Sequence, residues 1–198
     1  TQPPKKSKRG QKINISSVQK FSEKNNLTVR NPENLNNDKE YNFIKSLSAD
    51  IAIVVAYGKL IPKNILKTTK LGFINIHASL LPKWRGAAPI HRAIMNGDKK
   101  TGVSIMKIEE KLDSGPVLAS KELALDQNST FDEIQKKLSM IGPDLLIESL
   151  KNIEKGKAEF IDQVHSDSTY AKKIDKNETK INWSLDANKV ITHIHGLS

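Results

Sequence analysis

Cysteine is absent from the 198 residues of this chain, and the longest uninterrupted apolar run is the stretch 51–57. Without cysteine the chain can form no disulfide, no thiol nucleophile and no cysteine metal site. A run of that length is far below the roughly 18 apolar residues of a membrane helix. No apolar stretch follows the charged residues at the start of the sequence, so we expect no signal peptide. We therefore expect a cytoplasmic protein, or one of an organelle matrix in a eukaryote, with no membrane partner.

Signatures of several common enzyme classes are also missing. No two of the 10 glycines are spaced as G-x-G, which excludes a dinucleotide fingerprint, and no G-x-x-x-x-G-K sequence occurs, which excludes a P-loop. No G-x-S-x-G nucleophile elbow occurs. His193 and His195 stand two residues apart, but no third ligand lies within reach along the sequence, so we expect no metal site there.

Positive charge is concentrated at one end of the chain. The net charge is +10, and residues 1–22 contain no acidic side chain but six basic ones: Lys5, Lys6, Lys8, Arg9, Lys12 and Lys20. Such a segment favours binding to a polyanion, and a nucleic acid is the first candidate. The alternative is a solvated tail without a specific role. Arginine is scarce beside lysine, so its four positions draw attention: Arg9, Arg30, Arg85 and Arg92.

Apolar periodicity predicts alternating helices and strands. The run 51–57, apolar on both faces and rich in β-branched residues, is typical of a buried parallel strand. We expect helices at 16–24, 36–47, 62–66, 90–95 and from 129 to near 156, the last kinked at Gly142-Pro143, and strands at 27–30, 51–57, 73–78, 102–108 and 117–125. Residues 1–15 are predicted to form a loop. This alternation indicates an α/β fold with an open, largely parallel sheet, in which ligands bind beyond the carboxyl ends of strands.

Two polar side chains close the predicted strand 73–78. Asn75 and His77 are two residues apart, so they lie on the same face of that strand. An amide can donate to a developing oxyanion, and an imidazole can donate or move a proton. The plainer alternative is a hydrogen-bonded structural pair.

Two loops that follow strand ends carry further candidates. In the sequence SLLPKWRGAAPI, prolines and a glycine restrict the backbone path. Trp84 beside Arg85 is typical of a recognition surface, although Trp84 could equally fold back on the core. In KLDSGP, Asp113 opens an Asp-Ser-Gly sequence that is commonly only a turn.

Taken together, these residues resemble the methionyl-tRNA formyltransferase family of the formyltransferase superfamily. The superfamily shares an Asn-x-His at a strand end, a following SLLP, and an aspartate in a D-x-G turn, which match Asn75, His77, 79–82, Asp113 and Gly115. The run WRGAAPI separates this family from relatives that act on glycinamide ribonucleotide or on nucleotide-linked amino sugars, or that act hydrolytically. VVAYGKLIP and the later TYAKKI and INWS are also similar to it, so the resemblance covers essentially the whole chain.

The resemblance implies a Rossmann-like formyltransferase fold and an internal fragment of the catalytic domain. Residues 1–156 would form that domain without its first strand, helix and strand, and 1–15 would be a basic loop. Residues 157–198 would form a linker toward a C-terminal β-barrel domain that binds tRNA and is absent from this chain. We expect a monomer.

The implied reaction is transfer of a formyl group from 10-formyltetrahydrofolate to the α-amino group of methionyl initiator tRNA, for translation initiation. Asn75 would donate its amide to the formyl oxygen, and His77 would stabilise the resulting oxyanion, best as imidazolium. Asp113 would favour that imidazolium and would position the water that takes the amine proton.

The resemblance also implies where the substrates bind. Folate, the co-substrate, is expected at Tyr57, Gly58, Lys59, Leu60, Ile61, Pro62, Ser79, Leu80, Leu81, Pro82, Ile108 and Leu112. The tRNA is expected at Lys5, Lys6, Lys8, Arg9, Lys12, Trp84 and Arg85. No metal is expected, and the need for a sharp reversal predicts a cis Leu81–Pro82 peptide bond.

Two alternatives to this function remain. A folate-dependent formyltransferase of the same fold could act on an amino sugar or a nucleotide, but those relatives lack the basic loop. The chain could instead be a non-catalytic RNA-binding fragment, which an activity assay would distinguish.

Overall fold

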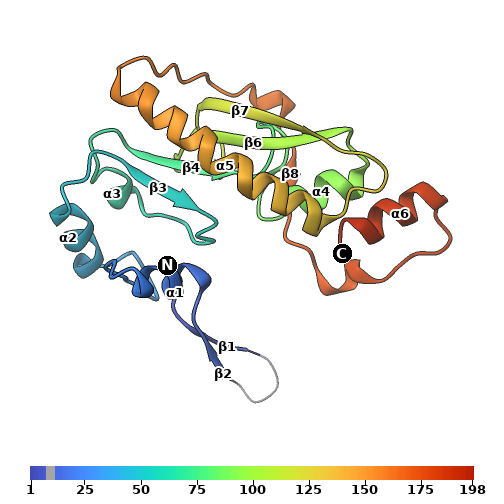
Figure 1. Ribbon diagram of the computed structural model, residues 1–198, viewed down its shortest axis with the longest axis horizontal. Helices are drawn as coiled ribbons and strands as arrows, with labels where there is room; N and C mark the ends of the chain where they lie inside the picture. Colours follow the sequence, from blue (N-terminus) through green and yellow to red (C-terminus); the bar gives the residue numbers. More distant parts are fainter. Residues whose placement is uncertain (8–11) are drawn as a thin grey trace. The chain divides into compact units, whose positions relative to one another are not determined.

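The computed structural model describes residues 1–7 and 12–198 of the chain (Figure 1). Lys8 and Arg9, two of the residues predicted to bind tRNA, lie outside the described residues, and so do the side chains of Lys6 and Lys12. The described chain forms two compact units. Thr1–Ile51 with Tyr57–Leu71 form the first, and Ala52–Ala56 with Gly72–Ser198 form the second.

The first unit begins with a short hairpin in the region predicted to be a loop. Strands β1 (Lys5–Ser7) and β2 (Lys12–Asn14) pair antiparallel, so the loop prediction is wrong for these residues. Three helices follow: α1 (Ser17–Lys24), α2 (Asp38–Ser46) and α3 (Lys63–Leu66). Ser16 and Asn37 cap α1 and α2 through their side-chain oxygens, as polar residues at these positions commonly do. No strand forms at 27–30, contrary to the prediction.

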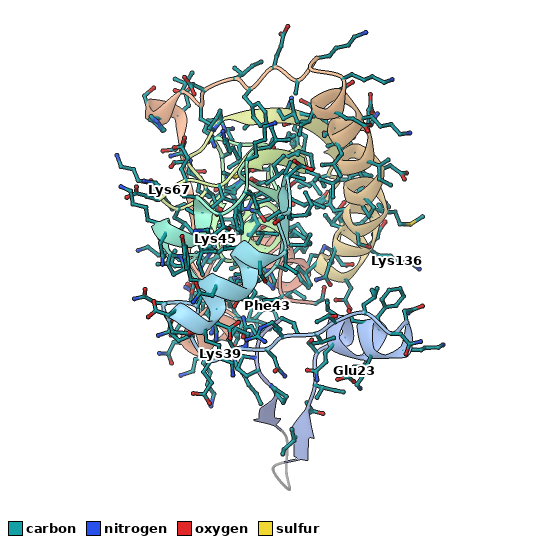
Figure 2. All side chains as sticks on the ribbon, turned by 90° about the vertical axis from the view of Figure 1, so that its left-hand side faces the viewer. Glu23, Lys39, Phe43, Lys45, Lys67 and Lys136 are labelled. Carbon is teal, nitrogen blue, oxygen red and sulfur yellow. The ribbon has the colours of Figure 1, made fainter. Side chains whose placement is uncertain are left out.

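One scarce arginine organises α2. Arg30 forms an ion pair with Glu40, and its guanidinium carbon lies 4.2 Å from the centre of the Phe43 ring. The hydrogen bonds from Arg30 hold the pKa of the Glu40 carboxyl below its usual value. Lys39 and Lys45, on the same helix, are exposed to solvent (Figure 2).

The second unit is built on a four-stranded sheet with the strand order β3-β4-β6-β7. These strands are β3 (Ala52–Val55), β4 (Phe73–His77), β6 (Lys100–Lys107) and β7 (Val117–Ala124). β3 and β4 are parallel, whereas the β4–β6 and β6–β7 pairs are antiparallel. The predicted α/β architecture is confirmed, and the sheet is mixed, with a larger antiparallel share than we expected. The β6–β7 connection contains no helix, and a parallel pair would require a longer crossover.

The first strand of this sheet is less buried than its composition predicts. Ile53 and Val55 are 38% and 57% exposed, whereas the run 51–57 was expected to be buried on both faces. The two side chains point to the same face of β3, an edge strand of the described sheet, and the half-buried Ala52 and Val54 point to the other face.

Helices pack around the sheet of the second unit. α5 (Phe131–Glu154) packs against β6 and β7, and α4 (Pro89–Asn96) packs against α6 (Ala187–His195) (Figure 1). α5 runs through Pro143 as one helix, so the chain does not break there, and the predicted kink stays a prediction. None of the described helices combines the length and apolar character that crossing a membrane requires. Ile65 is fully buried in the first unit. In the second unit the fully buried apolar side chains are those of Ile74, Val103, Ile105, Met106 and Ile134.

Residues beyond 157, predicted to be a linker, belong to the second unit. β8 (Tyr170–Ala171) pairs in parallel with the short strand β5 (Arg85–Gly86), and Ile161 bridges to Val117 at the start of β7. These pairings are made by backbone atoms, so they leave no apolar pattern in the sequence. The division at residue 156 remains a prediction.

Arg92 and Glu178 give the second unit a pH-dependent contact. Arg92 Nη1 and Nη2 donate to the Glu178 carboxylate at 2.6 and 3.0 Å, which lowers the pKa of Glu178 from 4.5 to about 2. A carboxylate with a lowered pKa stabilises the folded state above its ordinary pKa, and this contribution is lost as the pH falls through the folded value. We expect Glu178→Gln to lower the free energy of unfolding at pH 6, and the difference from wild type to shrink between pH 4.5 and pH 2.

Urea unfolding at pH 6, 4.5 and 3 measures this difference. Glu122→Gln is a suitable control because Glu122 pairs with Lys100 on the exposed surface, where both side chains are 60% exposed. A Glu178→Gln difference that stays constant with pH would contradict the prediction.

Candidate functional site

Strand β4 places two polar side chains at its carboxyl end. Asn75 and His77 share one face of the strand because side chains alternate along it. His77 is only 6% exposed, and its neighbour in the ladder with β6 is the fully buried Ser104. A buried imidazole requires hydrogen-bond partners, and the surrounding loops supply them.

Both ring nitrogens of His77 face protein oxygens. Nε2 lies 2.9 Å from the carbonyl oxygen of Trp84, so it carries a proton and donates it. Nδ1 lies 3.7 Å from Oδ2 of Asp113, which is an ion-pair distance rather than a hydrogen bond. The predicted approach of His77 and Asp113, which are distant in the sequence, is therefore confirmed.

Asp113 is held by the backbone on the opposite side of the site. Its Oδ2 accepts a hydrogen bond of 2.8 Å from the N–H of Gly86. Its own φ is +46°, a left-handed conformation that few residues other than glycine adopt, although aspartate tolerates it better than most. Oδ1 accepts no hydrogen bond from any other residue that the structure describes, which leaves that oxygen available to a ligand or water.

The Asn75 amide is half-buried and points to the same side as His77. Within the described part of the chain, its side chain makes no hydrogen bond. An amide N–H without a protein partner, on the same strand face as His77, can donate to an anionic oxygen of a substrate.

A serine network anchors the loop that follows β4. Ser104 Oγ donates to the carbonyl oxygen of Ser79 at 2.7 Å and accepts from the N–H of Leu81 at 3.2 Å. It also lies 3.0 Å from Oγ of Ser120 on β7. The Leu81–Pro82 peptide bond is cis, as predicted. Ser104 therefore fixes the start of the loop that carries Trp84 to His77.

The structure gives different surroundings to Trp84 and Arg85, the two loop residues predicted to contact tRNA. The Trp84 indole is partly exposed and donates from Nε1 to Asp98 at 2.7 Å. Arg85 is only 3% exposed, which leaves its guanidinium no surface for an RNA phosphate. Its expected surface position is thus wrong, because its hydrogen bonds to Gln163 and His165 hold it inside the unit.

The predicted folate-binding residues divide between the two units. Tyr57, Gly58, Lys59, Leu60, Ile61 and Pro62 lie in the first unit. There the Tyr57 carbonyl accepts a 2.6 Å hydrogen bond from Gln2, and burial raises the pKa of the Tyr57 hydroxyl. Lys59 Nζ donates to the backbone carbonyls of Pro32 and Glu33, at 3.3 and 2.5 Å, rather than standing free.

The remaining predicted folate contacts lie in the second unit. Ser79 is fully buried, and its hydroxyl donates to the carbonyl of Lys83 at 2.6 Å, so its side chain serves the loop itself. The N–H of Ile108 donates to Phe73 at 2.7 Å and is not available to a pterin ring. Leu112, next to Asp113, is 51% exposed and could contact a flat ligand. A folate role for these residues remains a prediction.

Three residues of the site were not found from the sequence. Gln163, His165 and Thr169 contact the loops around Asp113 and Trp84, but they lie in a segment without apolar periodicity. A single glutamine in a polar segment carries no signal. The remaining histidines lie elsewhere: His91 packs against Phe131 with ring centres 3.8 Å apart, and burial lowers the pKa of the His91 imidazole.

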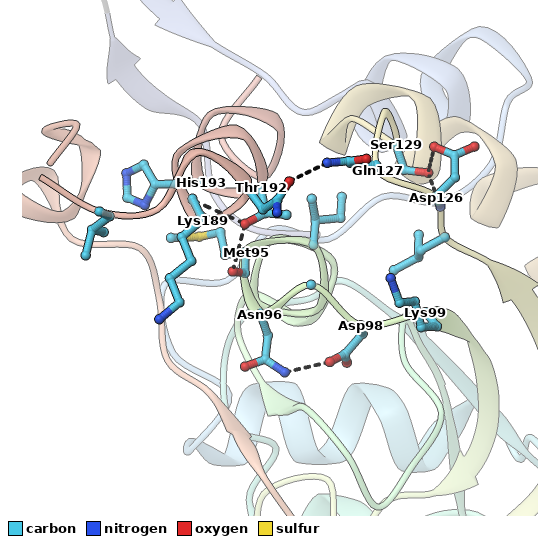
Figure 3. A pocket seen from close by; sticks show the side chains of 15 residues that line it. Met95, Asn96, Asp98, Lys99, Asp126, Gln127, Ser129, Lys189, Thr192 and His193 are labelled. Atoms are coloured by element: carbon cyan, nitrogen blue, oxygen red, sulfur yellow. Dashed lines mark hydrogen bonds between the residues drawn. The ribbon is translucent and has the colours of Figure 1, made fainter. Parts of the chain in front are cut away.

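A cavity of about 660 Å³ opens between the end of α4, the segment that precedes α5, and α6 (Figure 3). Its lining includes Asp98, which also accepts a 2.6 Å hydrogen bond from Asn96. Neither His77 nor Asp113 lines this cavity. Among the described residues, no group of three or more His, Asp or Glu could hold a metal ion.

The arrangement around His77 suits chemistry at a carbonyl group. Asn75 and the His77 ring carry N–H groups that can donate to an oxygen that becomes negatively charged, and Asp113 is an acceptor for a proton or a water. Backbone atoms of Trp84 and Gly86 orient the imidazole and the carboxylate.

Comparisons with known proteins agree with this chemistry. A family model described as "Formyl transferase" matches residues 1–150. The methionyl-tRNA formyltransferase of Pelagibacter ubique (strain HTCC1062) is 50% identical over 198 residues, and that of Bartonella henselae (strain ATCC 49882 / DSM 28221 / CCUG 30454 / Houston 1) is 46% identical over 199 residues. Each comparison covers 100% of this chain but 64% of the relative, so the chain spans less than two thirds of these proteins.

A solved structure shares the fold. The N-formyltransferase from Helicobacter canadensis, crystallised with folinic acid and dTDP-3-aminofucose, matches with a TM-score of 0.72. The match covers 96% of this chain and 65% of that one, at 17% sequence identity. At this identity the likeness concerns the fold alone.

The serine network generates a stability prediction. Ser104→Ala would leave the Ser79 carbonyl and the Leu81 N–H without their buried partner. We expect a loss of about 1–3 kcal/mol in the free energy of unfolding, measured by urea denaturation. Ser120→Ala is the matched control, because Ser120 is exposed and contributes only the contact to Ser104. Equal losses in the two variants would show that Ser104 does not anchor the loop.

Proposed function

Because the chain belongs to the formyl transferase family, we propose that the protein transfers a formyl group from 10-formyltetrahydrofolate to the α-amino group of methionyl initiator tRNA. The observation that carries this proposal is the geometry of His77, whose ring lies between the Trp84 carbonyl and the Asp113 carboxylate. Asn75, on the same strand face, adds the unpaired amide that a developing oxyanion requires.

In the proposed reaction, the methionyl amine attacks the formyl carbon and the carbonyl electron pair moves to the formyl oxygen. The tetrahedral intermediate then collapses, its bond to folate N10 breaks, and N10 takes a proton while the amine loses one. The reaction requires donors for the oxyanion and an acceptor for the amine proton. No covalent intermediate with the protein is needed.

His77 has one nitrogen available for this work. Its Nε2 proton is committed to the Trp84 carbonyl, so Nδ1 is the nitrogen that would face the oxyanion. In the imidazolium form Nδ1 carries a proton, and the Asp113 carboxylate beside it offsets the positive charge. The Asn75 amide would donate to the same oxygen, and one such donor typically contributes about 10²–10³ in rate.

Asp113 would manage the amine proton. Its Oδ2 is occupied by the Gly86 N–H and faces His77, which leaves Oδ1 to hold a water molecule. That water would take the proton that the attacking amine releases. A carboxylate in this position acts as base through one water, within the reach that general base catalysis requires.

A reduced folate is the proposed formyl donor. The Helicobacter canadensis N-formyltransferase, which shares the fold, was crystallised with folinic acid. In the second unit, residues 80–82 and the exposed Leu112 would contact the folate. Residues 57–62, in the first unit, remain predicted folate contacts. The fully buried Ser79 hydroxyl and the Ile108 N–H would support the loops instead of the ligand.

Initiator tRNA is the favoured acceptor. The relatives named methionyl-tRNA formyltransferase are 50% and 46% identical to the chain, whereas the sugar-binding structural relative is 17% identical. The basic residues among 1–22 suit a polynucleotide better than a sugar nucleotide. Formylation of methionyl-tRNA would take place where translation occurs, in the cytoplasm or an organelle matrix.

The direct test compares acceptors. The full-length protein is supplied with 10-formyltetrahydrofolate and with either methionyl initiator tRNA or a dTDP-linked amino sugar. We expect formylmethionyl-tRNA as the main product. Formyl transfer to the sugar alone would support the alternative acceptor, and RNA binding without any transfer would favour a non-catalytic role.

His77→Ala tests the oxyanion mechanism. We expect kcat to fall by about 10²–10³ with little change in KM for either substrate, because the imidazolium acts when charge develops on the formyl oxygen. Steady-state kinetics against both substrates measure this. His195→Ala, on α6 outside the site, serves as the control.

An Asn75→Ala variant should behave like His77→Ala. The double variant should lose less than the sum of the single losses, since both groups act on one oxygen. If His77→Ala kept its kcat and lost only folate affinity, His77 would bind the co-substrate and the mechanism would be wrong.

The basic residues near the start of the chain predict how tRNA affinity depends on salt concentration. Replacing Lys5, Lys6, Lys8, Arg9 and Lys12 with glutamine should raise KM for tRNA and leave folate binding unchanged. Each lost phosphate contact should reduce the slope of log affinity against log salt by about 0.7–0.9.

A matched control removes the same charge from another surface. The exposed lysines Lys136, Lys137, Lys151, Lys155 and Lys157 lie on or just beyond α5, where Figure 2 labels Lys136. Replacing these five with glutamine should change the salt slope little. Equal slopes for the two multiple variants would mean that the N-terminal segment makes no specific contact.

A further inference from the structure

A line of buried polar side chains connects residues 161–171 with Asp113. This segment, called the 161–171 segment below, lies where the sequence predicts a linker. Arg85 and Gln163 form the centre of this line of buried side chains, and they are 3% and 8% exposed. Polar groups this well buried are retained only when they are hydrogen-bonded, so their partners indicate what they do.

The orientation of the Gln163 amide follows from Arg85. Arg85 donates to Gln163 Oε1 from Nε at 3.0 Å and from Nη2 at 2.7 Å. Since the guanidinium has only donors, the glutamine oxygen must face it, and the NH₂ group must face the other way. Gln163 Nε2 donates there to the carbonyl oxygens of Asp113, at 3.0 Å, and Gly115, at 2.6 Å.

The loop that receives these bonds is under backbone constraint. Asp113 has a φ of +46°. At Gly115, a Cβ atom would lie 2.1 Å from the carbonyl oxygen of Lys107, so no side chain fits. A left-handed aspartate next to so close a backbone approach requires support from its surroundings. Gln163 supplies it by binding two carbonyls of the loop at once.

The same segment holds the opposite side of the site. Thr169 accepts from the N–H of Arg85 through its carbonyl and from the N–H of Trp84 through its hydroxyl, both at 2.9 Å. The stretch that it holds supplies the carbonyl that binds His77 and, at Gly86, the N–H that binds Asp113. One segment therefore contacts both loops whose spacing sets the distance from His77 to Asp113.

We propose that Gln163 and Arg85 are positioning residues for Asp113, and that the 161–171 segment is a working part of the site rather than a connection. Gln163 fixes the Asp113 loop, and Arg85 fixes the direction of the Gln163 amide. An effect of these residues on catalysis rests on the proposed formyl transfer. The positioning of Asp113 by Gln163 and Arg85 does not depend on it.

The amide group of Gln163 distinguishes a positioning role from a role in holding Arg85 alone. No carboxylate pairs with Arg85 in the described part of the chain, although a glutamate at position 163 would neutralise its charge. A glutamate would, however, have no N–H for Asp113 and Gly115. An amide is the side chain that both accepts from Arg85 and donates to the loop.

Gln163→Glu in the full-length protein tests the proposal. It keeps an acceptor for Arg85 but places a carboxylate oxygen against two carbonyls. We expect kcat for formyl transfer to fall at least tenfold with KM for the folate within about threefold, because Asp113 is displaced while the binding surface remains.

A second readout does not depend on activity. The Gly86 N–H donates to Asp113 Oδ2, so its hydrogen exchange, followed by NMR, reports the position of that carboxylate. We expect exchange at Gly86 to accelerate at least tenfold in Gln163→Glu. The N–H of Ala87, which donates to Ala171, should keep its exchange rate and thereby show that the β5–β8 pairing persists.

Arg92→Gln is the matched control. Arg92 also ties a late segment to the unit, through the Lys172 carbonyl and Glu178, but it makes no contact with the Asp113 loop. This variant should leave both kcat and Gly86 exchange unchanged. If Gln163→Glu does not fold, Arg85→Lys decides, since lysine keeps the charge but not the paired donors that orient Gln163.

The outcomes separate the two proposals. Unchanged kcat and unchanged Gly86 exchange in Gln163→Glu, or in Arg85→Lys where the first does not fold, would overturn the positioning role. A wild-type protein without formyl transfer would overturn the proposed function, and Gly86 exchange would still decide whether Gln163 positions Asp113.

Discussion

The approach of Asp113 to His77 is the interaction on which the rest of the site depends. His77 lies at the end of strand β4 and Asp113 lies in the loop between β6 and β7, and the gap of 3.7 Å between their atoms is kept by neither side chain itself. The stretch 84–86 keeps it, because it presents a carbonyl to the imidazole and an N–H to the carboxylate. Any movement of this stretch would shift both groups together, so the pair is preserved as long as the stretch stays in place.

The scaffold restrains that stretch from three sides. β4 and β6 are held by a core of fully buried side chains that includes Ile74 and Ile105. Ser104 then anchors the loop where it leaves the sheet, and the 161–171 segment anchors it farther along. Loops positioned by a rigid sheet commonly carry function, and here the restraints are hydrogen bonds to backbone atoms, which fix direction as well as distance.

Sequence patterns predicted the parts of this structure that depend on apolar burial. The strand at 73–77, the helix at 131–154 and the pairing of His77 with Asp113 follow from periodicity or from the family resemblance. The hairpin within 5–14 and the β5–β8 pair were missed, because their residues are polar and their partners are set by backbone bonds. Arg85 was expected at the surface, since an arginine on a loop shows no sign in sequence of a buried acceptor more than 70 residues away.

The predicted domain boundary near residue 156 rests on apolar patterning alone. Apolar density falls there, and a linker is the ordinary interpretation of such a fall. The 161–171 segment is attached instead through Ile161 to Val117, Gln163 to Asp113, and Thr169 to Trp84. Such contacts bury little apolar surface, so they contribute less to stability than to geometry. A segment attached in this way can determine how a catalytic pair is aligned while leaving almost no trace in the hydrophobic pattern of the chain.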